Sequence, residues 1–208
     1  MQQLTKYASC EFEIKRSRFL AEGFQVSDAN EARRIIKRQK EKYKNATHVV
    51  HAFSIGKNAE VLGSSDDGEP AGTAGAPALK VVQSMHVTNV LITITRWFGG
   101  ILLGTGGLVK AYSEAAKQLF ESTHLEPIIE KCSVDFSLSY AEYHTVKNAL
   151  ADFELEALRT DFGTLVDVHA VLPQKNFAVF SDYIKNATNG RVQLCESGTD
   201  NQTDHIKP

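Results

Sequence analysis

The sequence has few cysteines, and their placement argues against two classes of site. Its 208 residues include only Cys10, Cys132 and Cys195, and no two of them form a Cys-x-x-Cys pair. An odd number of widely spaced cysteines fits neither a disulfide framework nor a zinc site. We therefore expect each thiol to pack as a small apolar side chain, and we expect no metal ion and no cofactor.

Long apolar runs are also missing. No stretch reaches the roughly 18–20 apolar residues that a bilayer span needs, and residues 1–7 lack the apolar core of a secretory signal. These absences predict a soluble, cytoplasmic protein with no membrane partner. With 42% hydrophobic and 23% charged residues, the composition is that of a folded chain with one large domain or two small ones.

Familiar catalytic and nucleotide-binding signatures are absent as well. The chain contains no Gly-x-Ser-x-Gly, no His-Glu-x-x-His and no Gly-x-Gly-x-x-Gly. His48 and His51 are three residues apart in an expected strand, so their side chains should point to opposite faces and not share a metal ion. We assign no catalytic residue, and we favour a binding protein over an enzyme.

A glycine-rich segment, residues 96–112, holds five of the 14 glycines. It lies between an expected strand and an expected helix that starts at Leu108, with Lys110 on its first turn. Unpaired amides and the dipole at a helix N-terminus favour an anion. A tight crossing of two backbones is an equally good interpretation. The candidate ligand-binding or anion-binding residues are Arg96, Gly99, Gly100, Gly104, Gly106, Gly107 and Lys110.

A second segment, residues 63–76, is rich in Ser, Asp, Gly and Pro. Its three carboxylates could hold Mg²⁺ or act as a general base, which makes a Mg-dependent phosphate-handling enzyme one alternative. The same residue types are common in turns, and Asp66 or Asp67 could instead cap backbone amides or pair with Arg96. We favour a structural or partner-contacting loop that uses Asp66, Asp67, Glu69 and Thr73.

Positive charge gathers near the N-terminus. The net charge is −2, but residues 1–50 carry 11 Lys and Arg against 6 Asp and Glu. Most of these cations lie in an expected hairpin turn and in a helix that Ser27 would cap and that runs to about Lys44. If the two elements are neighbours, they form a basic face for nucleic-acid phosphates, with Tyr7, Tyr43 and Trp97 available for stacking. This face would consist of Lys15, Arg16, Arg18, Arg34, Lys37 and Arg38.

Hydrophobic periodicity predicts two α/β domains. The first has strands over 11–14, 19–26, 48–55 and 89–95 and helices over 27–44, 78–85 and 108–121. The second has strands over 131–139, 155–160, 165–172 and 191–196, helices over 141–153 and 176–189, a turn at 161–163, and Gly190 as a left-handed helix cap. Its β-α-β-β-α-β order is ferredoxin-like. We assign residues 1–127 and 131–200 to the domains and 201–208 to a flexible tail.

Several motifs resemble the IMPACT family, in particular its bacterial, YigZ-like branch. They are residues 65–75 (Ser-Asp-Asp-Gly-Glu-Pro-Ala-Gly-Thr-Ala-Gly), 96–100 (Arg-Trp-Phe-Gly-Gly), 103–108 (Leu-Gly-Thr-Gly-Gly-Leu), 15–19 (Lys-Arg-Ser-Arg-Phe) and Thr47-His48. The resemblance covers nearly the whole chain. Trp97 is a mild departure, because the family often has tyrosine there.

The resemblance implies an α+β fold of two domains. The N-terminal domain would resemble the second domain of ribosomal protein S5, and the C-terminal ferredoxin-like domain would resemble domain V of elongation factor G. Both relatives touch ribosomal RNA, and eukaryotic members of the family regulate translation by binding a protein activator of a stress kinase. We therefore expect a non-enzymatic protein that binds RNA or the ribosome and regulates translation. A protein-interaction module with a protein partner is the alternative.

Overall fold

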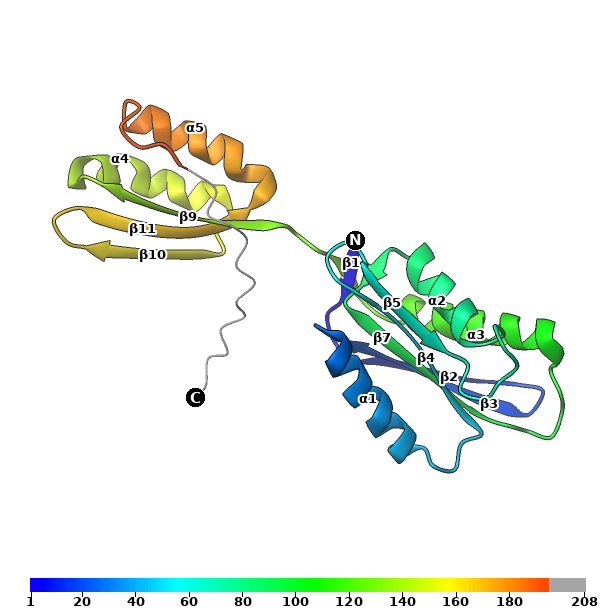
Figure 1. Cartoon of the computed structure of the whole chain (residues 1–208). Helices are drawn as coiled ribbons and strands as arrows, with labels where there is room; N and C mark the ends of the chain where they lie inside the picture. Colours follow the sequence, from blue (N-terminus) through cyan, green and yellow to red (C-terminus); the bar gives the residue numbers. More distant parts are fainter. Residues whose placement is uncertain (195–208) are drawn as a thin grey trace. The chain divides into compact units, whose positions relative to one another are not determined.

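A computed structural model describes residues 1–194 of the chain (Figure 1). The chain divides into two compact units, Met1–Ile128 and Ile129–Pro208. Each unit combines a β-sheet with helices, which confirms the α+β class with two domains. None of the helices within residues 1–194 is long and apolar enough to cross a membrane.

The N-terminal unit is built on a five-stranded antiparallel sheet with strand order β2-β3-β7-β4-β5. Its strands are β2 (Ala8–Ile14), β3 (Ser17–Gln25), β4 (His48–Ile55), β5 (Val61–Ser65) and β7 (Val90–Trp97). The apolar, β-branched run of β7 forms the centre of the sheet, where such residues pack on both faces. The predicted strand over 48–55 coincides with β4.

Helices cover both faces of this sheet. Helix α1 (Ala29–Lys42) lies on one face, and α2 (Gly75–Ser84) and α3 (Gly104–Glu121) lie on the other (Figure 1). Because side chains alternate along a strand, Leu91 packs under α1 while Ile92 packs into the larger core under α2 and α3. We call these the α1 face and the α2/α3 face of the sheet.

Several short strands were not predicted from the sequence. Strand β1 (Gln2–Leu4) lies between β6 (Val87–Thr88) and β8 (Leu125–Pro127) in a small second sheet. The prediction of a loop over 63–76 was wrong at both ends, because β5 extends through Ser65 and pairs with β4, and α2 begins at Gly75 rather than at residue 78. Strands this short carry too few alternating residues to be recognised as strands.

Helix α1 is capped one residue later than predicted. Asp28, not Ser27, is its cap, since the Asp28 Oδ1 accepts hydrogen bonds from the amides of Asn30 at 2.7 Å and Glu31 at 2.8 Å. Ser27 instead donates from its amide and hydroxyl to the Glu31 carboxylate. The helix ends at Lys42, two residues before the predicted end.

Helix α3 begins earlier than predicted. It starts at Gly104 rather than Leu108, so residues 104–107 form its first turn and Lys110 lies on the second turn. The prediction failed because glycine has a low intrinsic helix propensity. Burial of Leu108 and Ala111 against the sheet stabilises the helix despite its glycine-rich start.

The C-terminal unit has a three-stranded antiparallel sheet with order β10-β11-β9. Its elements are β9 (Lys131–Leu138), α4 (Tyr140–Leu150), η1 (Ala151–Phe153), β10 (Ala157–Phe162), β11 (Val166–Pro173), η2 (Gln174–Asn176) and α5 (Phe177–Ala187). Gly190 has φ of 79°, and its amide donates to the Lys185 carbonyl at 2.7 Å, which confirms the predicted left-handed cap.

Two details of this unit differ from the prediction. Asp161 and Phe162 belong to β10, so the predicted turn moves toward Gly163. The predicted last strand is not seen over 191–194, and its residues 195 and 196 lie outside the described residues, as does the predicted tail over 201–208. The order β-α-β-β-α matches the first five of the six expected elements.

Candidate functional site

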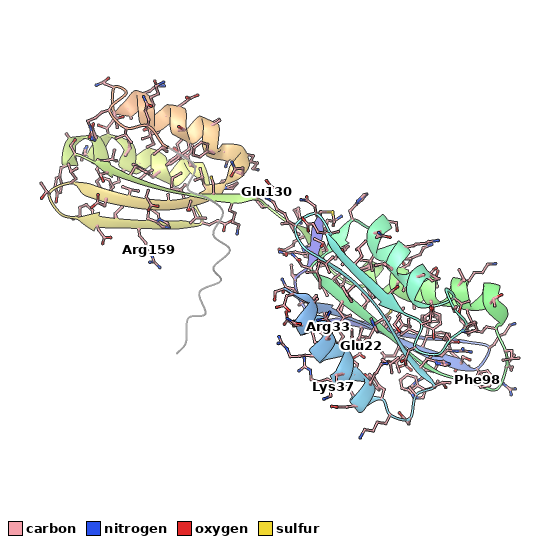
Figure 2. The ribbon with its side chains drawn as sticks, viewed as in Figure 1. Glu22, Arg33, Lys37, Phe98, Glu130 and Arg159 are labelled. Atoms are coloured by element: carbon pink, nitrogen blue, oxygen red, sulfur yellow. The ribbon has the colours of Figure 1, made fainter. Side chains whose placement is uncertain are left out.

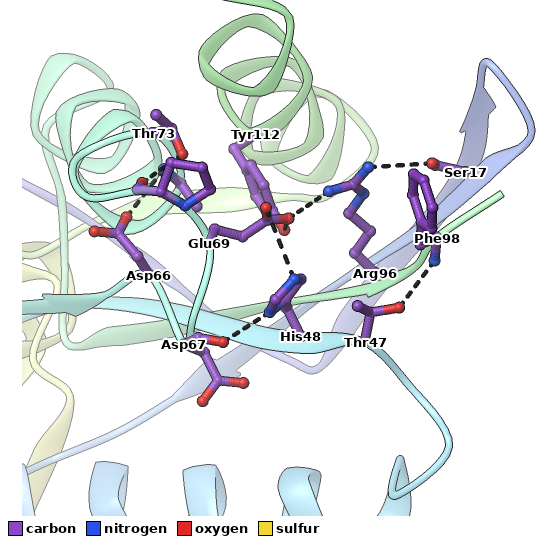
Figure 3. Close-up of polar contacts among 12 residues, drawn as sticks. Ser17, Thr47, His48, Asp66, Asp67, Glu69, Thr73, Arg96, Phe98 and Tyr112 are labelled. Carbon is purple, nitrogen blue, oxygen red and sulfur yellow. Dashed lines mark hydrogen bonds and ion pairs between the residues drawn. The ribbon is translucent and has the colours of Figure 1, made fainter. Parts of the chain in front are cut away.

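The Arg96 side chain is buried at the end of β7. Its Nη1 donates to Glu69 Oε1 at 2.7 Å and its Nη2 donates to Ser17 Oγ at 3.3 Å (Figure 3). Arg96 is 4% exposed and Glu69 is 8% exposed. The predicted contact of Arg96 with an external anion does not fit this geometry, because the guanidinium is covered and its charge is already paired.

Two further side chains join the Glu69 carboxylate. The Tyr112 hydroxyl donates to Glu69 Oε1 at 2.7 Å, and His48 Nε2 lies 3.8 Å from Glu69 Oε2 (Figure 3). Burial, followed by the hydrogen bond to Glu69, raises the pKa of Tyr112 far above its ordinary value. The sequence analysis missed Tyr112 because it lies on the apolar stripe of α3. Its hydroxyl was the available signal, since a buried tyrosine usually finds a polar partner.

The three carboxylates of residues 63–76 have separate partners. Asp66 accepts from backbone amides of its own loop, Asp67 accepts from the Val49 amide at 2.6 Å and pairs with Lys40, and Glu69 pairs with Arg96. Within residues 1–194, no three His, Cys, Asp or Glu side chains are grouped as metal ligands. Each of the three carboxylates is thus engaged by groups of the protein, and the magnesium-dependent enzyme stays an alternative from the sequence.

Asp66 organises the loop and the start of α2. Its carboxylate accepts from the amides of Gly72 at 2.8 Å, Ala74 at 3.0 Å and Gly75 at 2.8 Å. Burial alone raises the pKa of Asp66, but these three hydrogen bonds outweigh it and lower the pKa below its ordinary value. The interpretation of Asp66 as a cap for backbone amides is confirmed. Thr73 is also structural, since its hydroxyl donates to the Pro70 carbonyl at 2.6 Å.

The glycine segment contains the predicted close crossing. A Cβ on Gly99 would lie 1.9 Å from the carbonyl oxygen of Arg16, so only glycine fits there. By contrast, Gly104 and Gly106 are exposed, and a Cβ on either, or on Gly100, would meet open space. An anion at the amides of residues 104–107 stays a prediction.

The predicted basic face is divided between the two faces of the sheet. Lys15 lines a hollow beside α3, together with Gly107 and Lys110. Arg34, Lys37 and Arg38 line a different hollow of about 430 Å³ on the surface of α1. The predicted basic face and the predicted anion-binding residues therefore meet where Lys15 lies near Lys110, while the basic residues of α1 lie elsewhere.

Arg18 lies on the α1 face and forms part of a row of cationic and aromatic side chains. Its guanidinium carbon is 3.7 Å from the centroid of the Trp97 ring. The rings of Tyr43 and Trp97 are nearly perpendicular, with centroids 5.6 Å apart, and Lys42 Nζ lies 4.7 Å from the centroid of Tyr43. We call Arg18, Trp97, Tyr43 and Lys42 the aromatic ladder. Tyr7 does not join it, because its hydroxyl donates to Glu22 at 2.8 Å.

Comparison with known proteins gives matches along most of the chain. Residues 15–120 match the Impact N-terminal domain, and residues 136–191 match a domain of unknown function, DUF1949. The IMPACT family member YigZ of Escherichia coli (strain K12) is 30% identical over 184 residues, which cover 88% of this chain and 90% of that protein.

Solved structures give matches of two kinds. One, described as the crystal structure of an hypothetical protein, is 27% identical with a TM-score of 0.64 and covers 96% of this chain and 98% of that chain. Another, described as the two-domain translational regulator Yih1, is 24% identical over 56% of this chain and 47% of that chain. Its TM-score of 0.39 is too low to support a functional argument. The domain match over more than half of the residues and the extended similarity to YigZ show that this chain belongs to the IMPACT family.

Proposed function

We propose that this protein binds RNA through the outer surface of α1 and the aromatic ladder, and that it thereby takes part in the regulation of translation. The aromatic ladder is the observation that carries the proposal. Aromatic rings and stacked guanidinium groups are the side chains on which unpaired bases stack, and neighbouring cations contact phosphates. The ladder places both kinds of group in one row at the end of α1. Its two cations also pair with carboxylates, Arg18 with Glu11 at 3.5 Å and Lys42 with Glu22 at 3.2 Å, so the ladder mainly offers stacking.

The surface of α1 supplies the charge. Figure 2 shows Arg33 and Lys37 on this helix, and Arg34, Lys37 and Arg38 are exposed. In the part of the chain that the structure describes, Arg34, Lys37 and Arg38 form no ion pair with a carboxylate. Glu31 and Glu41 line the same hollow, so this surface of α1 carries an excess of positive charge for a polyanion, next to Lys42 and Tyr43 of the ladder.

RNA binding is tested with a short, unstructured, labelled RNA and the full chain, by fluorescence anisotropy from about 50 to about 300 mM salt. We expect affinity to fall steeply as salt rises. Arg38→Glu should weaken binding about tenfold or more and make the salt dependence less steep by about 0.7 to 1 in the log–log slope. Lys80→Glu is the matched control, since Lys80 is an exposed cation on α2 and the charge change is the same.

The proposal fails if RNA does not bind at the lowest salt concentration. It also fails if Lys80→Glu weakens binding as much as Arg38→Glu, because the charge effect would then be independent of the α1 surface. Co-sedimentation with ribosomes tests the link to translation, which rests on the resemblance to the family. The wild-type chain should sediment with ribosomes at low salt, and Arg38→Glu should remain in the supernatant.

A second candidate function is a protein-interaction module, which the loop over residues 98–103 favours. This loop exposes three large apolar side chains, with Phe98 44%, Ile101 42% and Leu102 81% accessible. A group of exposed apolar side chains is a common feature of protein-binding surfaces. Figure 2 shows Phe98 at one end of the N-terminal unit.

Leu102→Asp tests this second function, because it changes an exposed side chain and leaves the core intact. Arg96→Ala is unsuitable, because it would leave Glu69 buried without its cationic partner. If the loop binds a partner, wild-type protein should retain one specific protein from a lysate and Leu102→Asp should lose it. Equal retention by both would exclude this loop as the contact surface.

A further inference from the structure

The hairpin turn between β2 and β3 has left-handed backbone angles at both of its central residues. Lys15 has φ of 48° and Arg16 has φ of 63°, and Ile14 pairs with Ser17 across the turn. Two-residue turns of this kind favour Asn-Gly, because a Cβ is unfavourable at positive φ. Here two long cationic side chains occupy the positions, which costs free energy, and such strain is often found at functional sites.

The glycine segment holds this turn in place. Gly99 passes so close to Arg16 that no Cβ would fit between them. Ser17 Oγ accepts from the Gly99 amide at 3.2 Å and from Arg96 Nη2 at 3.3 Å. The buried pair of Arg96 and Glu69 is therefore connected to the turn and helps to fix the position of Lys15.

Lys15 lines a surface hollow of about 530 Å³ between this turn and α3. The volume is within the range of small-molecule sites. Ile14 and Leu103, which also line it, pack against the main core, and Val109 beside them is 38% exposed. The hollow therefore offers an apolar surface to a ligand.

Three lysines, Lys15, Lys110 and Lys117, surround this apolar surface. All three are exposed, and among residues 1–194 none of them forms an ion pair. The single carboxylate of the hollow, Glu114, accepts a hydrogen bond from Gln118 at 2.8 Å. The dipole of α3 adds positive potential at its N-terminal end. The rim of the hollow thus carries more positive than negative charge, since three lysines face the single carboxylate of Glu114.

We infer that this hollow binds a small anionic amphiphile, a molecule with a carboxylate or phosphate head group on a short apolar body. The apolar body covers Ile14, Leu103 and Val109, and the head group lies among the three ammonium groups. This site is separate from the proposed RNA surface, because the aromatic ladder lies on the α1 face of the sheet and the hollow lies beside α3. An experiment on amphiphile binding can therefore give a positive or a negative result independently of RNA binding.

Isothermal titration calorimetry on the full chain tests this inference with four probes. Octanoate and octyl phosphate carry both features and distinguish the two head groups, whereas octanol lacks the charge and acetate lacks the apolar body. We expect at least one of the anionic amphiphiles to bind about tenfold or more tightly than octanol and acetate. Equal binding of octanol, or no binding of either anionic amphiphile, would overturn the inference.

Three variants locate the site. Lys110→Ala should weaken the preferred amphiphile about tenfold. Lys15→Gly should weaken it similarly without harming the turn, because glycine accepts the positive φ of that position. Lys80→Ala, on α2, should leave affinity unchanged. Unchanged affinity in both Lys110→Ala and Lys15→Gly, or an equal loss in Lys80→Ala, would show that the ligand binds elsewhere.

Discussion

The two faces of the N-terminal sheet differ in how completely their buried polar groups are paired. On the α2/α3 face, Glu69 accepts from both Arg96 and Tyr112, and both contacts are 2.7 Å. On the α1 face, a row of polar residues follows the strand register: Ser9, Glu22, Thr93, His51 and Ser65 are successive neighbours across all five strands, and Glu22 and Thr93 are the buried ones.

Polar atoms on the α1 face are often left without a protein partner. Among residues 1–194, the fully buried side-chain atoms without a hydrogen-bond partner are Glu22 Oε2, Gln39 Oε1, His51 Nδ1, Thr93 Oγ1, Thr95 Oγ1 and Arg96 Nε. All but the last belong to the α1 face. Burial alone therefore does not measure how much a polar residue contributes to stability, because a group with a hydrogen-bond partner and a group without one respond differently to substitution.

The largest effect is expected from Glu69→Leu, which leaves the buried guanidinium of Arg96 unpaired. We expect it to lower the free energy of unfolding by about 3–5 kcal/mol. Urea unfolding followed by the fluorescence of Trp97, the single tryptophan of the chain, measures the N-terminal unit specifically. The double variant Glu69→Leu/Arg96→Met should recover much of the loss. A single-variant loss below about 1 kcal/mol would mean that the pair is not required for stability.

Tyr112→Phe should have the next largest effect, because it removes one hydrogen bond to the Glu69 carboxylate and leaves the ring packed. We expect a loss of about 1.5–3 kcal/mol, which is typical of a hydrogen bond to a charged group. The same urea experiment measures it. Stability equal to that of the wild type would show that the hydroxyl does not support the buried pair.

Thr93→Val is the matched substitution on the α1 face. It replaces a fully buried hydroxyl that lacks a protein partner with a methyl group of similar shape. We expect stability to change by less than about 0.5 kcal/mol, or to rise. A loss as large as that of Tyr112→Phe would contradict the difference between the two faces.

The smallest effect concerns the pH dependence of His51. Burial, followed by repulsion from Lys40, lowers the pKa of His51 below its ordinary value, so the unfolded chain binds a proton more readily than the folded one. This contribution to stability is complete above about pH 6.5. It is lost as the pH falls below that value and through the lowered pKa of His51 in the folded chain. Unfolding measured from about pH 7 to about pH 5 should therefore lose less stability in His51→Gln than in the wild type. Identical pH profiles of the variant and the wild type would contradict the assignment of this pH dependence to His51.

Sequence patterns predicted the elements with long periodic runs. The strand over 48–55, the central β7 and the helices on both faces were all recognised, because their apolar residues recur at regular intervals. The tight crossing seen at Gly99 and the amide-capping role of Asp66 were each among the alternatives that the sequence left open, because glycine and aspartate have several uses in such loops.

The polar pairing at the site could not be predicted in the same way. Arg96 pairs with Glu69, which is 27 positions away, and Ser17 and Tyr112 reach the same cluster from other elements. Only the strand register and the position of α3 bring these side chains together. The row of polar residues from Ser9 to Ser65 could not be predicted for the same reason, because each strand contributes one residue to it.

A titration of unlabelled, single-stranded RNA against the fluorescence of Trp97 tests the central claim most directly. Trp97 is the only tryptophan and lies in the middle of the aromatic ladder. If RNA binds at the ladder, the fluorescence should change and saturate with the affinity found by anisotropy, and the change should disappear at high salt. RNA binding by anisotropy with constant Trp97 fluorescence would contradict the claim.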